Sequence, residues 1–276
     1  MMTDTNVHFS DVSRFADVDR TEDPQQLIDV LDVAKRLPGF ATAKTDLLEH
    51  VRANGASSAL DVGCGYGADV IALAERLAPG GRVTGIDASV AMIAEAQRRT
   101  MQSGLPVSFQ VGDALALPFA DNAFDLCRTE TVLQHVADPG RAVAEMTRVT
   151  RPGGRVGALE LDPGTLYIDH PDIELFDALR RSFISAVVGS MARQVPRLFT
   201  EAGLVDVHTT AHVIFGTPHA YRLMLGHHVD ALCAYDAIGP ERANRWWDTI
   251  DAAEASGHLT GGITALVVVG TVAGEE

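Results

Sequence analysis

From about residue 57 onwards, short apolar segments alternate with segments in which apolar residues recur at helical spacing. The short segments predict strands, because they are rich in β-branched residues and are bounded by turn residues. Seven strands are predicted in this way: Ser58–Gly63, Arg82–Asp87, Val107–Val111, Phe124–Thr129, Gly154–Leu161, Val205–Phe215 and Ile263–Ala273. Strands that alternate with helices form mostly parallel sheets, so the pattern predicts an α/β fold.

Several of the intervening helices have ends that the sequence marks. Ser89 is a candidate N-cap, and Gly104 is a candidate C-terminal glycine for the same helix. Pro139 suits the first turn of a helix predicted over Arg141–Thr150. Another helix is predicted over residues 68–78, directly after the first strand. Helices of this kind supply the crossover connections that parallel strands require.

Two parts of the chain lie outside the alternating pattern. Before it, helices are predicted over residues 24–35 and 41–53. The last two strands are separated by far more residues than a hairpin needs, and apolar residues recur there twice at helical spacing, which predicts two added helices. We expect a single domain with an N-terminal helical lid (residues 1–53), a core (residues 54–215 and 263–276) and a helical insert (residues 216–262).

The composition excludes several classes of function. The chain has 276 residues and a formal net charge of −15, which no cluster of Lys or Arg offsets locally. An acidic surface repels phosphate backbones, so we expect a small-molecule substrate and no nucleic acid. No run of eighteen apolar residues is present, so we expect no membrane span. The N-terminal residues lack the pattern of a secretion signal, so we do not expect secretion. Three widely spaced cysteines are typical of a cytoplasmic protein without structural zinc.

The segment Ala59–Ala68 carries the strongest chemical signal of the chain. It predicts a buried strand, then glycines at alternate positions from residue 63 to residue 67, then the start of a helix. Glycines let a ligand lie against the backbone, and the helix presents free N–H groups to that ligand. Asp87, at the end of the second strand, can accept both hydroxyl protons of a ribose. These features indicate an adenosine-containing cofactor, and NAD(P) satisfies them as well as other such cofactors.

Residues around the glycine loop narrow the choice. Asp61 opens the pattern Asp-x-Gly-x-Gly-x-Gly, Asp113 follows the third predicted strand, and Pro152-Gly153-Gly154 precedes the fifth. With these motifs the sequence resembles the class I S-adenosylmethionine-dependent methyltransferases, closely over residues 41–160 and loosely over residues 161–275. The resemblance implies a Rossmann-like, seven-stranded, mostly parallel sheet with helices on both faces, an antiparallel last strand and helical cap elements.

The resemblance also implies which residues hold the cofactor. Asp87 takes the ribose hydroxyls, Asp113 accepts from the adenine amine, and Asp61 orients the loop or meets the ammonium group of the cofactor. Lys44 can reach the cofactor carboxylate, with a position in solvent as the alternative. The expected cofactor-binding residues are Asp61, Gly63, Cys64, Gly65, Gly67, Asp87, Ala88, Met92, Gly112, Asp113, Ala114, Arg128 and Thr129.

Catalytic and substrate-binding candidates follow the fourth and fifth strands, because ligands of open α/β sheets bind at the carboxyl ends of the strands. The sulfonium of S-adenosylmethionine already activates the methyl group, so the reaction needs alignment more than a fixed base. His135 is a candidate base or a structural residue of its loop, and Glu130 is a candidate for binding or orientation. The expected substrate contacts are Asp162, Tyr167 and His170.

The sequence therefore predicts a small-molecule methyltransferase, monomeric or homodimeric, similar to quinone-biosynthesis and natural-product methyltransferases. S-adenosylhomocysteine is the expected product of the cofactor. No metal site is expected, since His208 and His212 have no evident Cys or acidic partners. Two alternatives stay open: an NAD(P)-dependent oxidoreductase, and a catalytically silent partner protein that binds S-adenosylmethionine.

Overall fold

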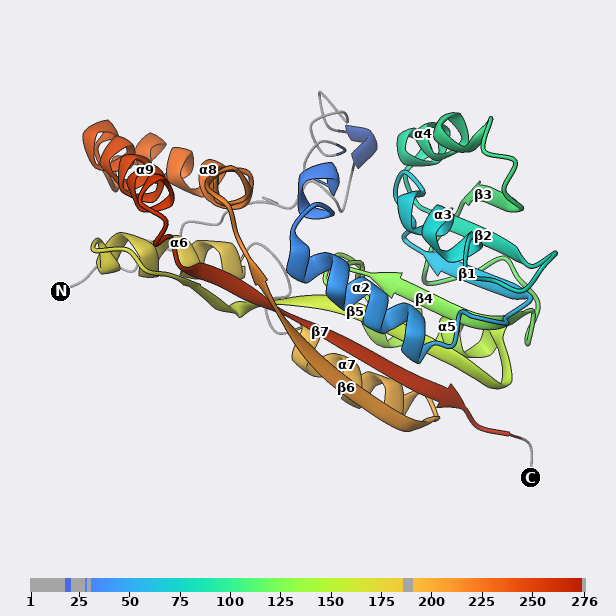
Figure 1. Ribbon diagram of the computed structural model, residues 1–276. Helices are drawn as coiled ribbons and strands as arrows, with labels where there is room; N and C mark the ends of the chain where they lie inside the picture. The colour runs from blue at the N-terminus through green and yellow to red at the C-terminus, as the bar shows by residue number, and fades with distance from the viewer. Residues whose placement is uncertain (1–17, 21–27, 29–30, 186–190, 275–276) are drawn as a thin grey trace.

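The computed structural model describes residues 18–20, 28, 31–185 and 191–274. Seven strands form one sheet in the order β3-β2-β1-β4-β5-β7-β6. They are β1 (Ser58–Val62), β2 (Arg82–Asp87), β3 (Val107–Val111), β4 (Phe124–Glu130), β5 (Thr150–Ile168), β6 (Leu204–Phe215) and β7 (Gly261–Val272). Strands β1 to β5 pair in parallel, and β7 lies antiparallel between β5 and β6 (Figure 1). The predicted fold class is confirmed, including the antiparallel last strand.

Helices cover both faces of this sheet. They are α2 (Pro38–His50), α3 (Ala68–Ala74), α4 (Val90–Thr100), α5 (Pro139–Val149), α6 (Ile173–Ser185), α7 (Met191–Glu201), α8 (Pro218–Ala234) and α9 (Pro240–Ala255). Leu47 of α2 and Leu159 of β5 belong to one apolar layer, and Met146 of α5 and Val156 of β5 belong to another. The central strands β1, β4 and β7 are therefore mostly buried, as their apolar residues predict, whereas much of the edge strand β6 is exposed.

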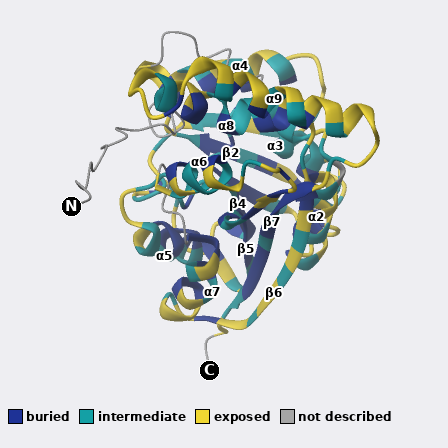
Figure 2. Cartoon of the chain, turned by 90° about the vertical axis from the view of Figure 1, so that its left-hand side faces the viewer, coloured by how far each residue is buried: buried dark blue, intermediate teal, exposed yellow. Residues whose placement is uncertain are grey.

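The helical insert and α6 form a lobe beside the sheet (Figure 1). Its helices α8 and α9 are the two that the spacing predicts between the last two strands. Leu225, Trp246 and Ile250 are buried, whereas much of the outer surface of the lobe is exposed (Figure 2). No helix among the described residues is long and apolar enough to cross a membrane.

Strand β5 is longer than predicted. It runs from Thr150 to Ile168, whereas the sequence predicts a strand that ends at residue 161 with a loop after it. Its register with β7 is interrupted between Asp162 and Tyr167, where Gly164 N donates to Asp162 Oδ1 at 3.1 Å. Pro163 and Gly164, which suggest a loop in the sequence, therefore form an irregularity inside a continuing strand.

Helix boundaries are confirmed in part. Ser89 caps α4 as predicted, with its side chain accepting from Met92 N, but α4 ends at Thr100 and Gly104 lies beyond it. Helix α3 ends at Ala74, four residues earlier than predicted.

The N-terminal helices differ from the prediction in extent. Helix α2 begins at Pro38, because proline fits the first turn of a helix, and it ends at His50. The sequence predicts this helix over residues 41–53. Most of the helix predicted over residues 24–35 lies outside the described residues, and its described part is helical over residues 31–34.

Candidate functional site

The loop between β1 and α3 contains three glycines with left-handed backbone conformations. The φ angles are 71°, 51° and 80° at Gly63, Gly65 and Gly67. A Cβ at Gly63 would overlap the side chain of Val132, and a Cβ at Gly67 would lie 2.7 Å from the ring of Phe109. These two glycines make room for the protein's own side chains. Among the described residues, a Cβ at Gly65 would meet a single atom, at 3.8 Å, so the backbone at Gly65 is open to a ligand.

Asp87 ties this open glycine to the start of α4. Its Oδ2 accepts from Gly65 N at 2.8 Å, and its Oδ1 accepts from Ser89 N at 2.9 Å. Burial raises the pKa of Asp87, although the two backbone bonds oppose that shift. Each carboxylate oxygen keeps a second lone pair, so Asp87 can accept from two hydroxyl groups without releasing the loop.

The residues predicted for the adenine side surround the end of β3. Gly112 N donates to Asp87 O at 2.9 Å, which fixes the start of the loop after β3 next to β2. Asp113 is exposed and its Oδ1 accepts from Leu115 N at 2.8 Å. Met92, on the first turn of α4, is only 2% exposed.

Four further predicted residues have varied surroundings. Cys64 is buried, and burial raises the pKa of its thiol well above the ordinary value. Thr129 is fully buried and donates to Val62 O at 2.9 Å, a bond that joins β4 to β1. Ala88 is exposed and Ala114 is half-buried.

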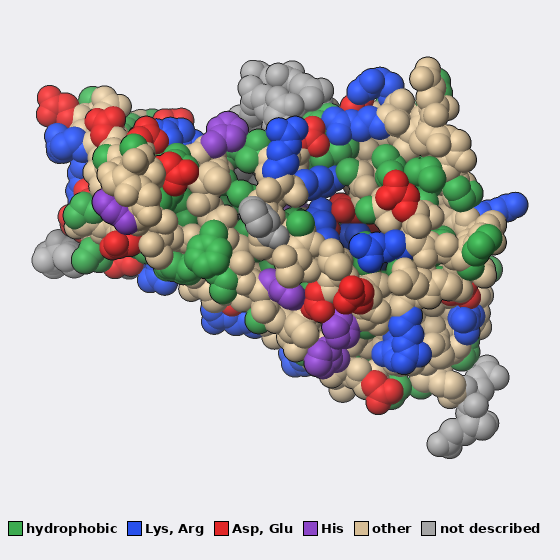
Figure 3. All heavy atoms as spheres, viewed as in Figure 1, with side chains coloured by type: hydrophobic (Ala, Val, Ile, Leu, Met, Phe, Trp, Pro, Cys, Tyr) green, Lys and Arg blue, Asp and Glu red, His purple; other side chains and the backbone are tan. Residues whose placement is uncertain are grey.

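Charged side chains from four elements form an ionic cluster beside the glycine loop. Arg128 of β4 donates to Glu130 at 2.7 Å and lies 3.4 Å from Asp61 of β1. Lys44 of α2 lies 2.7 Å from Glu130 and 3.0 Å from Asp69 of α3. Figure 3 shows basic and acidic side chains together around a hollow on this face of the molecule. We call these five residues the ionic cluster.

Within the ionic cluster, the pKa values of Asp61 and Asp69 shift in opposite directions. Burial raises the pKa of Asp61 to about 7, because Arg128 only partly offsets the loss of hydration and nearby carboxylates add negative charge. Burial acts on Asp69 in the same direction, but Arg128 and two lysines outweigh it and hold its pKa well below the usual range. The second lysine is Lys35, 3.7 Å from Asp69. Such a mixture of charges suits a ligand end that carries both an ammonium and a carboxylate group.

A cavity of about 50 Å³ lies between the glycine loop and the ionic cluster. Its lining residues are Leu31, Lys35, Asp61, Gly63, Cys64, Gly65, Tyr66, Asp69, Arg128, Glu130 and Thr131. Pockets for small molecules usually measure about 300–1,000 Å³. Leu31 and Lys35 precede α2, so the N-terminal region narrows the cavity.

The described part of the N-terminal region, residues 18–20, 28 and 31–37, is bonded to the site. Tyr66 Oη lies 2.5 Å from Asp32 Oδ1. Asp19 accepts from Ser89 Oγ at 2.6 Å at the N-terminus of α4. Because these partners adjoin Gly65 and Asp87, the N-terminal region covers the residues expected to hold the adenosine.

The two candidate catalytic residues lie on and just after β4. Glu130 lines the cavity and is paired with Arg128 and Lys44. His135 is half-buried on the turn between β4 and α5, where its backbone N donates to Val132 O at 2.8 Å. The structure therefore places Glu130 at the cavity and His135 on the turn that follows β4.

The three expected substrate contacts do not line the cavity. Asp162 is buried and lies 2.6 Å from Arg193 of α7. His170 is buried with its ring 3.8 Å from that of Trp246, and burial lowers its pKa. Tyr167 is 40% exposed on the extension of β5. Their contact with a substrate stays a prediction.

Sequence reasoning missed Lys35, Asp69, Tyr66 and Asp32. Asp69 and Tyr66 adjoin the glycine motif, so a polar residue in the first turn of α3 is a signal that could have been used. Lys35 and Asp32 reach the site from the N-terminal region, and no spacing in the sequence shows where that region docks.

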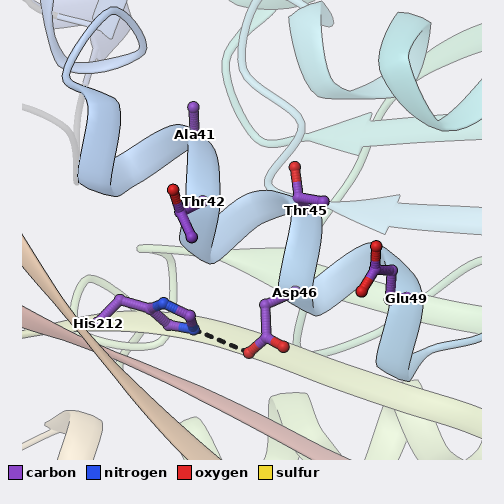
Figure 4. A pocket seen from close by; sticks show the side chains of 6 residues that line it. All are labelled: Ala41, Thr42, Thr45, Asp46, Glu49 and His212. Atoms are coloured by element: carbon purple, nitrogen blue, oxygen red, sulfur yellow. Dashed lines mark hydrogen bonds and ion pairs between the residues drawn. The ribbon is translucent and has the colours of Figure 1, made fainter.

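A larger hollow, of about 390 Å³, lies on the outer side of α2 (Figure 4). It contains a hydrogen bond between His212 of β6 and Asp46 of α2, with Nε2 and Oδ2 2.8 Å apart. The expectation that His212 lacks an acidic partner was wrong, because α2 brings Asp46 to it. Among the described residues, no group of three His, Cys, Asp or Glu could hold a metal ion. The hollow does not include the glycine loop.

Comparison with known proteins establishes the family. A family model described as a methyltransferase domain matches residues 60–157. A ubiquinone/menaquinone biosynthesis C-methyltransferase of Desulfotalea psychrophila is 34% identical over 170 residues, which cover 56% of this chain and 68% of that protein. The chain belongs to the class I S-adenosylmethionine-dependent methyltransferases.

Two further comparisons extend over more of this methyltransferase. An uncharacterised 37.1 kDa protein in transposon TN4556 of Streptomyces fradiae is 37% identical over 249 residues, 88% of this chain and 70% of that protein. A structure of phosphoethanolamine N-methyltransferase 2 from Haemonchus contortus, in complex with phosphomonomethylethanolamine and S-adenosylhomocysteine, aligns with a TM-score of 0.60. It is 18% identical and the match covers 94% of this chain and 60% of that chain, which shows a shared fold.

S-adenosylmethionine is therefore the cofactor of this methyltransferase, and the NAD(P)-dependent oxidoreductase alternative is wrong. The residues of the site fit this cofactor. Gly65 leaves space against the backbone, Asp87 offers acceptors for a ribose, and the ionic cluster suits the charged methionine end.

Proposed function

We propose that this methyltransferase transfers the methyl group of S-adenosylmethionine to an O, N or C nucleophile of a small molecule. The observation that carries the proposal is the cavity beside Gly65, which Leu31 and Lys35 of the N-terminal region narrow. A covered site suits a small, partly apolar acceptor that is held away from water. The Desulfotalea relative is named for ubiquinone and menaquinone biosynthesis, so phenols and quinone-like rings are the first acceptors to test.

We assign the different groups of the cofactor to different residues of the site. We assign the ribose hydroxyls to Asp87 and the adenine amine to Asp113. We assign the carboxylate of the methionine part to Lys44 and Arg128, and its ammonium group to Asp61. Fixing both ends of the cofactor fixes the direction of its reactive methyl, and this alignment supplies much of the rate enhancement.

When bound, the cofactor would supply a methyl group that its sulfonium already activates, and an electron pair of the acceptor (a lone pair on O or N, a π pair on C) would displace S-adenosylhomocysteine from it. A base is required only where the acceptor arrives protonated with a high pKa. We assign that role to His135, because imidazole has an ordinary pKa close to neutrality. Glu130 is paired with two cations, so we assign it to orientation of the site.

We further propose that the chain is one methyltransferase domain whose residues 1–53 act as a lid and whose residues 216–262 cap the substrate side. Its net charge of −15 argues against a nucleic-acid partner, and its three widely spaced cysteines are typical of a cytoplasmic enzyme. We expect a monomer or a homodimer. Light scattering coupled to size-exclusion chromatography distinguishes the two, and a larger assembly would contradict this expectation.

The test of the proposed function uses cofactor with a deuterated methyl group. The enzyme is incubated with this cofactor and a small-molecule extract, and products that carry the label are identified by mass spectrometry. The Asp87→Ala variant is the matched control, because the loss of charge-assisted hydrogen bonds should weaken cofactor binding by about 1–3 kcal/mol. A labelled small molecule that forms with the wild type and declines with the variant supports the proposal. Label found only in protein or nucleic acid would refute it.

A further inference from the structure

Glu160 of β5 is completely buried and forms hydrogen bonds with the chain that follows β4. Its Oε1 accepts from Val132 N at 3.0 Å and from Leu133 N at 2.9 Å. We call residues 131–135, which include both donors, the β4 turn. One side-chain oxygen therefore holds two successive backbone N–H groups that lie about 28 positions earlier in the chain.

The β4 turn forms one wall of the cofactor cavity. Thr131 lines the cavity, and the side chain of Val132 occupies the space that a Cβ at Gly63 would need. Thr131 has a φ of 53°, which is unfavourable for a β-branched residue, so its conformation must be maintained by neighbours. The bond from Thr131 N to Leu159 O, at 2.8 Å, and the two bonds to Glu160 provide that support.

The hydrogen bonds that Glu160 forms within the described residues go to the β4 turn. Among the described residues, Glu160 Oε2 has no hydrogen-bond partner. Burial raises the pKa of Glu160 to about 8, with the two backbone bonds opposing the shift and Glu130 adding to it. Burial therefore favours the neutral carboxyl group, and its Oε1 accepts from the backbone.

We propose that Glu160 is a positioning residue for methyl transfer, which holds the β4 turn against Gly63 and so fixes Glu130 and Thr131 at the cofactor cavity. Glu160 does not line the cavity itself, so it acts through the turn. The inference rests on the proposed function only in taking this cavity as the place where the methyl donor binds.

The test compares two substitutions of Glu160 with a matched control. A glutamine side chain keeps an oxygen that accepts both N–H groups, whereas alanine leaves both without a partner. Asp125 supplies the control, because its Oδ2 also accepts from two successive backbone groups, Ser57 N at 2.7 Å and Ser58 N at 3.0 Å, at the opposite end of β1. The Asp125→Ala variant therefore removes the same kind of support away from the site, together with an ion pair to Arg151.

The measurements are the Kd of S-adenosylhomocysteine by calorimetry and the Tm of each unliganded variant. We expect Glu160→Ala to raise Kd about tenfold or more. A tenfold change corresponds to the net loss of roughly one neutral hydrogen bond. We expect Glu160→Gln to stay close to the wild type in Kd, and Asp125→Ala to lower Tm with Kd unchanged. Wild-type Kd in a folded Glu160→Ala variant would overturn the proposal, as would equal weakening in the Asp125→Ala control.

If Glu160→Ala does not fold, Val132→Ala tests the same contact from the other side of the β4 turn. This variant keeps the bonds to Glu160 and removes the side chain that packs on Gly63. We expect Kd to rise, and an unchanged Kd would overturn the proposal. Because the probe is S-adenosylhomocysteine, these outcomes do not depend on the acceptor. Failure to find a methylated small molecule would count against the proposed function alone.

Discussion

Lys44 on α2 reaches the carboxyl end of β4, where its Nζ lies 2.7 Å from Glu130 Oε1. Both side chains are largely buried, with 12% and 11% of their surfaces exposed. The same Nζ lies 3.0 Å from Asp69 Oδ1 on α3. One lysine therefore links α2 to the two elements that flank the cofactor cavity.

We expect Lys44→Met to weaken both folding and cofactor binding. Removal of the cation leaves the buried carboxylates of Glu130 and Asp69 with fewer positive charges nearby. This should lower the free energy of unfolding by about 1–3 kcal/mol. Urea denaturation measures this loss, and calorimetry with S-adenosylhomocysteine measures the change in Kd. Lys44→Arg is the control, because it keeps the charge. If Lys44→Met binds S-adenosylhomocysteine as the wild type does, Lys44 does not hold the cofactor carboxylate.

Substitutions in the glycine loop should separate packing from ligand binding. Gly63→Ala places a methyl group on the side chain of Val132, so we expect a large fall in Tm. Among the described residues, the methyl group of Gly65→Ala meets only Leu31, at an ordinary contact distance of 3.8 Å, and the left-handed φ of 51° costs only about 1–2 kcal/mol. We therefore expect Gly65→Ala to fold but to bind S-adenosylhomocysteine weakly, because its methyl group points to the ligand. Melting curves and calorimetry on both variants test this, and equal effects on Tm would contradict it.

This contrast shows what the sequence could supply about the site. The spacing of Gly63, Gly65 and Gly67 predicts a cofactor loop, and the structure confirms the loop's place between β1 and α3. The spacing does not show which glycine faces the ligand. That depends on Val132 and Phe109, side chains that tertiary folding brings to the loop.

The fold was predictable from local pattern because its strands are short, apolar and separated by helices. The extension of β5 was not, since the Pro-Gly pair at residues 163–164 resembles a loop and only pairing with β7 shows a strand. The ionic cluster was predictable only in part. Asp61 stands in the motif, but the partnership of Lys44 with Asp69 spans 25 positions and leaves no periodic signal.

Asp61 should make cofactor binding depend on pH. Burial raises its pKa to about 7, so it gains negative charge as the pH rises through neutrality. If Asp61 meets the ammonium group of the cofactor, affinity for S-adenosylhomocysteine should increase between pH 6 and pH 8, roughly one unit to either side of that pKa. Calorimetry across this range tests the expectation. Asp61→Asn should show weaker binding with a flatter pH profile, and a wild-type profile in that variant would exclude Asp61 as the titrating group.

The same shift has the opposite effect on the stability of the unliganded protein. The pKa of Asp61 is higher in the native state than the ordinary value of 3.8, so the native state holds this proton more tightly than the unfolded state does. Its contribution to stability is therefore present at low pH and is lost as the pH rises from about 4 to about 7. Relative to wild type, Asp61→Asn should gain stability over this range, as measured by urea denaturation at each pH. A constant difference between the two proteins would contradict this linkage.

Asp19 should control how fast the cofactor enters and leaves. Its carboxylate accepts from Ser89 Oγ at 2.6 Å, Val90 N at 2.9 Å and Ala91 N at 3.1 Å, which fastens the N-terminal region to the first turn of α4. Asp19→Ala removes these bonds, so the N-terminal region should release more often. We expect association and dissociation rates of S-adenosylhomocysteine both to increase, measured by surface plasmon resonance.

The control for Asp19 must remove a helix cap without touching the N-terminal region. Thr217 caps α8 by accepting from Ala220 N at 3.2 Å, far along the chain from the glycine loop, so Thr217→Ala serves this purpose. Its expected effect is a loss of stability of about 0.5–2 kcal/mol with unchanged binding rates. Faster exchange in Asp19→Ala but not in Thr217→Ala identifies the N-terminal region as the gate of the cofactor cavity. Equal rates in Asp19→Ala and the wild type would mean that the cofactor enters by a path on which Asp19 has no influence.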